Sequence, residues 1–81
     1  MPRISFTSSL RSALGGADAL EVKAATIREL LSKLAEDYPA IQKHLDAGIA
    51  VAIDGEIYRD KLDVKIPAKS EVFLMPRIAG G

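Results

Sequence analysis

One amphipathic helix, placed between segments with strand character, constrains the fold more than any other feature of the sequence. Its apolar residues share one face at helical spacing: Ile27, Leu30, Leu31, Leu34 and Tyr38. Thr26 and Glu29 fit a capping box, in which the hydroxyl and the carboxylate satisfy N–H groups at the helix start. Pro39 should end the regular helix near Tyr38. The sequence therefore predicts a core helix over residues 26–38.

Alternating segments on both sides of this helix predict strands. The expected strands are residues 3–7, 19–23, 49–53, 56–59 and 71–75. A loop is expected from Ser8 to Gly16, and Ala40 to Leu45 should add a short helical turn that Gly48 closes. Asp54-Gly55 suits a type I′ turn. This order predicts an α+β domain with a mixed sheet of four or five strands, one main helix on one face and the other face open.

The last predicted strand separates core side chains from candidate surface side chains. Val72 and Leu74 should point toward the helix, which turns Phe73 and Met75 outward. An aromatic ring and a methionine on an open face are typical of a partner-binding surface. Alternatively, they fill a covered edge, or the register is shifted by one residue. We expect Pro76, which has no N–H to donate, to stop the strand.

The core should be formed by residues from every predicted element. Those predicted to be mostly buried are Ile4, Phe6, Val22, Leu30, Leu34, Val51 and Leu74. Because the helix stripe packs on the sheet, it needs no cofactor to explain it. His44, the one histidine, lies in a helical stretch and is expected at the surface.

The amino-acid composition excludes several classes of function. The 81 residues carry eleven acidic and eleven basic side chains, so no basic field indicates a nucleic-acid partner. Cysteine is absent, which excludes disulfides, Cys-based metal sites and thiol catalysis. There is no signal-peptide pattern and no apolar run near ~18 residues. We therefore expect a soluble, cytoplasmic domain with no membrane partner, no metal and no permanently bound cofactor.

The chain ends in Arg77-Ile78-Ala79-Gly80-Gly81, which we expect to be a flexible tail beyond a domain of residues 1–76. Without Cβ atoms, Gly80 and Gly81 can enter a channel too narrow for side chains. Fully extended, the five residues reach roughly 16–18 Å. The carboxylate of Gly81, ionised at neutral pH, could attack the α-phosphate of ATP to give an acyl-adenylate. A frayed terminus is the alternative interpretation.

The stretch from Glu71 to Gly81 resembles the end of the ubiquitin-like sulfur carriers. This family includes the small subunit of molybdopterin synthase and the thiamine-pathway carrier. Ile4-Ser5-Phe6, followed by Leu10-Arg11, resembles the first strand and loop of the molybdopterin type, and Asp54-Gly55 lies where that family has a hairpin. The resemblance implies a β-grasp fold whose first and last strands are parallel and central.

For function, the resemblance implies that Gly81 is the reacting residue. An E1-like enzyme that uses ATP would adenylate its carboxylate, which would then become a thiocarboxylate that donates sulfur to a larger synthase subunit. Gly80 would share the narrow channel. The residues assigned to partner binding are Phe73, Met75, Arg77, Ile78, Ala79 and Arg11, although a solvated Arg11 is an equal alternative. The chain would be a protein co-substrate and not an enzyme.

Several functions stay open at this point. The molybdopterin synthase small subunit is favoured because thiamine-type carriers are typically shorter between the helix and the third strand. A carrier for thiamine or cysteine biosynthesis is the nearest alternative. The same activated glycine would also serve a ubiquitin-like modifier that is joined to lysines. Finally, the domain would be a β-grasp interaction module if the two glycines are incidental.

Overall fold

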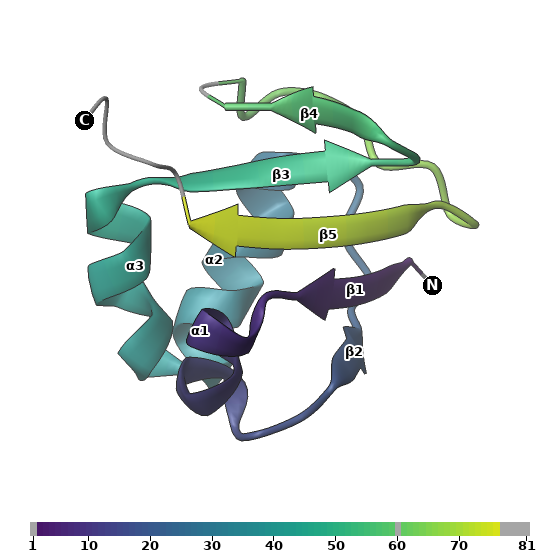
Figure 1. Cartoon of the computed structure of the whole chain (residues 1–81). Coiled ribbons are helices and arrows are strands. Elements are labelled where there is room, and N and C mark those ends of the chain that lie inside the picture. Colours follow the sequence, from purple (N-terminus) through teal and green to yellow (C-terminus); the bar gives the residue numbers. More distant parts are fainter. Residues whose placement is uncertain (1, 60, 77–81) are drawn as a thin grey trace.

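The computed structural model describes residues 2–59 and 61–76, which form a five-stranded sheet with helices against it (Figure 1). The strands are β1 (Arg3–Phe6), β2 (Ala19–Glu21), β3 (Ile49–Ile53), β4 (Glu56–Tyr58) and β5 (Glu71–Pro76). Their order across the sheet is β2-β1-β5-β3-β4. β1 and β5 are parallel, and the other neighbours are antiparallel. The predicted mixed sheet, with the first and last strands side by side within it, is confirmed.

Within the same residues there are three helices where the sequence predicted one main helix. They are α1 (Ser8–Arg11), α2 (Ile27–Asp37) and α3 (Gln42–Ala47), with short 3₁₀ turns at Ser12–Leu14 and Pro39–Ile41. The predicted loop from Ser8 to Gly16 is wrong. Leu10, Ala13 and Leu14 are buried at helical spacing, so this segment covers part of the core with its own apolar face. Gly15 then ends the turn in the left-handed conformation, at φ 76°.

The start of α2 is capped much as predicted. The Glu29 N–H donates to Oγ1 of Thr26 at 3.2 Å, which is half of the capping box. The other half is displaced by one residue, because Oε1 of Glu29 accepts from the N–H of Ala25 at 3.0 Å. Tyr38 caps the C-terminal end by donating its N–H to the carbonyl oxygen of Leu34 at 2.7 Å.

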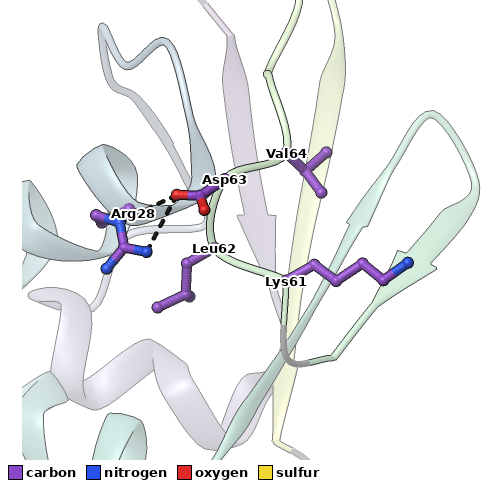
Figure 2. A pocket seen from close by; sticks show the side chains of 5 residues that line it. All are labelled: Arg28, Lys61, Leu62, Asp63 and Val64. Atoms are coloured by element: carbon purple, nitrogen blue, oxygen red, sulfur yellow. Dashed lines mark hydrogen bonds and ion pairs between the residues drawn. The ribbon is translucent and has the colours of Figure 1, made fainter.

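The segment before β5 accepts hydrogen bonds from other backbone N–H groups at the start of α2. The N–H groups of Ile27 and Arg28 donate to the carbonyl oxygens of Val64 and Leu62, at 3.1 and 2.8 Å. Figure 2 shows the side chain of Arg28 paired with Asp63, with Nη2 and Oδ1 3.1 Å apart. Protein groups thus occupy the first N–H groups of α2. These hydrogen bonds therefore attach the start of α2 to the segment before β5, and the N–H groups are not free to bind an anion.

The core lies between α2 and one face of the sheet. The buried residues that the sequence predicted correctly are Ile4, Phe6, Leu30, Leu34, Val51 and Leu74. Val22 is only half-buried, because it follows β2 at an edge of the sheet and has neighbours on one side. Among residues 2–59 and 61–76, no helix is long and apolar enough to span a membrane.

The two predicted turns around β3 are confirmed. Helical turn continues from Pro39 to Ala47, and the N–H of Gly48 closes it by donating to the carbonyl oxygens of His44 and Leu45. Asp54 and Gly55 have φ values of 48° and 90°, the two positive angles that a type I′ turn requires. The hairpin therefore places β4 beside β3 as an outer strand.

Candidate partner-binding face

The face of the sheet away from α2 carries the candidate site. β3 and β5 are in register, so that Ala52 lies opposite Phe73 and Ala50 opposite Met75. Residues on a strand alternate between faces, and the neighbours of Phe73 on β5 are fully buried in the core. Phe73 itself is 38% exposed. The predicted outward orientation of Phe73 and Met75 is confirmed, and a register shift by one residue is excluded.

The structure adds three residues that the sequence analysis did not assign to this face. Ile57 of β4 lies opposite Ala52 and is 54% exposed. We call the resulting surface the open-face patch, formed by Ala50, Ala52, Ile57, Phe73 and Met75. Its two alanines are buried although they lie on the open face, because larger side chains stand beside them. The alternation of alanine with Ile and Val in residues 49–53 was the available signal.

Two residues of the open-face patch, Phe73 and Met75, lie on β5, the strand that leads into the predicted tail. Because β1 and β5 are parallel, they end at the same end of the sheet, where the Thr7 N–H donates to the carbonyl oxygen of Leu74 at 3.2 Å. α1 follows β1 there and contacts β5 (Figure 1). Arg11, the last residue of α1, is exposed and pairs with Asp18, with Nη2 and Oδ1 3.4 Å apart. Arg11 is thus placed at the end of the domain from which residue 77 continues.

Pro76 is the last residue of β5, whereas the prediction ended the strand at Met75. The N–H of Asp54 donates to the carbonyl oxygen of Glu71, so alternate residues of β5 direct their backbone groups toward β3. Pro76, opposite Ile49, falls in the other set, and its nitrogen faces away from β3. On that side β1 has already ended at Phe6. Proline therefore breaks no hydrogen bond of the ladder at this position.

Five of the predicted site residues lie outside the described residues: Arg77, Ile78, Ala79, Gly80 and Gly81. Their assigned roles in adenylation and partner binding stay predictions. Among residues 2–59 and 61–76, no three His, Asp or Glu side chains form a group that could hold a metal ion.

One titratable group near the patch is perturbed. The hydroxyl of Tyr58 donates to Oε2 of Glu56 at 2.7 Å, and this hydrogen bond raises the pKa of Tyr58 above its ordinary value, because ionised tyrosine can no longer donate it. Both side chains alternate with Ile57 along β4, so they lie on the opposite face of the strand from the patch. This hydrogen bond therefore links two side chains of β4 and does not involve the open-face patch.

We expect Glu56→Gln to lower the pKa of Tyr58. The substitution removes the negative charge and weakens the hydrogen bond that favours the protonated hydroxyl. Absorbance titration of the tyrosines at alkaline pH measures the change. Glu36→Gln, at an exposed position of α2, is the matched control and should leave the curve unchanged. An unchanged curve for Glu56→Gln would show that this hydrogen bond does not persist in solution.

Fold and face together define a small β-grasp protein of the ubiquitin-like kind, with a helix across one side of its sheet and an apolar patch on the other. A sequence model of the ThiS family matches residues 4–81. The chain therefore belongs to the ThiS family, one of the ubiquitin-like sulfur-carrier families. No curated protein sequence matches the chain significantly.

Solved structures share this fold along nearly the whole chain. The BexX/CysO complex of Amycolatopsis orientalis contains a chain with a TM-score of 0.80 and 22% identity, and the match covers 100% of both chains. Small archaeal modifier protein 1 of Methanosarcina acetivorans matches with a TM-score of 0.76 and 19% identity, covering 99% of this chain and 95% of that one. A chain in the complex of subunits 1 and 2 of the molybdopterin-converting factor of Helicobacter pylori has a TM-score of 0.69 and 18% identity, covering 99% and 97%. At such identities the likeness shows the fold alone.

Proposed function

We propose that this chain is a sulfur carrier that works through Gly81. In the form that ends at Gly81, an E1-like enzyme adenylates the terminal carboxylate, and a thiocarboxylate then delivers sulfur to a larger synthase subunit. One observation carries this proposal. β5 lies within the sheet, presents Phe73 and Met75 on the open face, and leads directly into residues 77–81. This supports a partner that covers the open-face patch and also binds the residues proposed to react, which follow β5 directly in the sequence.

The proposed reaction divides its work between the chain and its partners. A carboxylate oxygen of Gly81 attacks the α-phosphorus of ATP, which releases pyrophosphate and forms an acyl-adenylate. Hydrogen sulfide ion then attacks the acyl carbon and displaces AMP, leaving a thiocarboxylate and a proton. The activating enzyme supplies the ATP site. The chain supplies the acyl group, a docking face and no cysteine of its own to intercept the acyl-adenylate.

For the sulfur acceptor, we propose the large subunit of molybdopterin synthase. The support is the segment between α2 and β3, which holds a 3₁₀ turn and α3 and so has the greater length expected of the molybdopterin type. An enzyme of thiamine or cysteine biosynthesis is the alternative acceptor. Offering the sulfur-loaded chain to each acceptor enzyme separates these cases, because only the correct one should restore the carboxylate at Gly81.

Intact-mass analysis tests the carrier proposal. The chain is incubated with the E1-like enzymes of its source organism, ATP and sulfide. We expect a mass increase equal to the replacement of one oxygen by one sulfur. The same mixture without sulfide, but with lysine-bearing proteins, tests the modifier alternative, for which conjugates should form. A chain that is neither loaded nor conjugated by any of these enzymes would overturn the proposal.

We expect Met75→Lys to weaken binding of the activating enzyme by roughly tenfold or more, because a charge would be buried in an apolar contact. The melting temperature should change little, since Met75 faces away from the core. Leu62→Lys is the matched control: it places the same charge at an exposed leucine on the segment that packs on α2. Calorimetric titration and thermal unfolding measure both effects. If Met75→Lys unfolds the domain, Met75 belongs to the core and not to the patch.

A further inference from the structure

The outer strand β4 has an exposed apolar side chain and lies at an edge of the sheet, where a further strand could pair with it. β4 is the last strand in the sheet order, and Figure 1 shows it along one margin of the sheet. In the part of the chain that the structure describes, no strand pairs with its outer side. Ile57, in the middle of β4, is more exposed than Phe73, at 54% against 38%.

The register shows in which direction the backbone of Ile57 points. Asp54 donates its N–H to Glu71 of β5 at 2.9 Å, so Ala52, two residues earlier on β3, also directs its backbone groups toward β5. Ala52 is the residue opposite Ile57. These two residues therefore exchange no hydrogen bonds with each other. The N–H and C=O of Ile57 point out of the sheet, where a further strand would bind.

The two edges of the sheet are protected differently. At the other edge, Glu21 of β2 stands opposite Arg3 of β1, so that the open face carries charges there. Charged side chains at an edge are a common device against unwanted strand pairing. At β4, the residue with the outward backbone groups is an isoleucine, and its side chain is continuous with the open-face patch through Ala52. At this edge an apolar side chain therefore lies beside backbone groups that point out of the sheet.

We propose that an extended segment of the activating enzyme adds to β4 and exchanges two backbone hydrogen bonds with Ile57 while the same enzyme covers the open-face patch. This inference rests on the proposed function and names how the partner binds. Side-chain packing on Phe73 and Met75 supplies most of the buried area, and the added strand fixes the orientation of the partner along the sheet. The partner must therefore carry an extended apolar segment beside its tail channel.

A second copy of this chain fits the edge less well. β4 has three residues and offers one outward-facing backbone pair, at Ile57. Two such strands, paired about a two-fold axis, would bury far less than the ~1,200 Å² that stable interfaces need. A partner that already binds the open-face patch can also pair with β4, and it does not lose translational and rotational freedom a second time. These considerations favour the activating enzyme over self-association.

Comparing Ile57→Pro with Ile57→Ala tests the added strand. Both variants lose the isoleucine side chain, but the proline also loses the outward N–H. Proline is tolerated at an edge position whose N–H faces solvent, and no hydrogen bond to β3 is lost. We expect Ile57→Pro to bind the activating enzyme about 5- to 30-fold more weakly than Ile57→Ala, because a carbonyl of the partner is left unpaired. Equal affinities, with both variants folded, would overturn the proposal.

Hydrogen exchange of the unmutated chain provides a test that does not depend on either variant folding. The amide of Ile57 should exchange rapidly in the free chain and become protected when the activating enzyme binds. The amide of Tyr58, which is directed toward β3, should be protected in both states. An Ile57 amide that stays unprotected in the complex overturns the added strand, and so does an Ile57-dependent dimer in sedimentation. If no enzyme adenylates Gly81, the proposed function itself fails, and the edge proposal fails with it.

Discussion

Deleting Gly81 is expected to abolish adenylation of the chain and to leave its fold unchanged. The deletion withdraws the reacting carboxylate by about 3.3–3.6 Å, the length of one extended residue. A misplacement of about 1 Å can cost 10²-fold in rate, so we expect a loss of at least ~100-fold. The loss should appear in pyrophosphate release by the activating enzyme, measured at saturating ATP.

Two controls separate the position of the carboxylate from other effects of the deletion. Gly81→Ala keeps the length and adds a methyl group, so it reports how narrow the channel is. The melting temperature reports the fold, which residues 2–59 and 61–76 form with their own core. A deletion variant that is still adenylated at the normal rate would show that the Gly81 carboxylate is not the reacting group. In that case the interaction-module alternative would stand.

Leu34→Ala is expected to reduce the free energy of unfolding by about 2–5 kcal/mol. Leu34 is 1% exposed and lies on the face of α2 that packs against the sheet, so its truncation leaves a cavity in the core. For a domain of this size the melting temperature should fall by roughly 10 °C or more. Urea unfolding monitored by circular dichroism measures the free energy.

The matched control for this substitution is Leu62→Ala, which removes the same atoms from a leucine that is 36% exposed. Its cost should be well below that of Leu34→Ala, because less apolar surface is removed from the interior. If Leu34→Ala costs less than ~0.5 kcal/mol, α2 does not present this face to the sheet in solution.

The sequence predicted the faces of the long elements well, for a simple physical reason. Strand alternation has a period of two, so burying Val72 and Leu74 leaves one possible direction for Phe73 and Met75. The stripe on α2 is equally restrictive because it runs over three turns. In contrast, α1 is a single turn and is too short for periodicity to distinguish it from a loop.

One part of the candidate site follows from a predicted hairpin, and another depends on pairing between strands that are distant in the sequence. Ile57 belongs to the open-face patch because the Asp54-Gly55 turn places it opposite Ala52. Pro76 could join β5 because β1 ends before that position and because its nitrogen faces away from β3. The relation at Pro76 is not visible until the order of the strands is known, whereas the pairing of Ile57 with Ala52 already follows from the predicted two-residue turn. The residues from Arg77 to Gly81 are assigned from sequence alone, and their roles rest on the experiments above.

The position of β5 between β1 and β3 has a mechanical consequence for the proposed reaction. A partner that draws residues 77–81 into a channel exerts a force along the axis of β5. The hydrogen bonds to β1 and β3 run across this direction, so they resist the force together, in shear, and do not open one at a time. An outer strand loaded in the same way would be held on one side only. The tail is thus attached to the strand best able to bear tension while the domain stays folded.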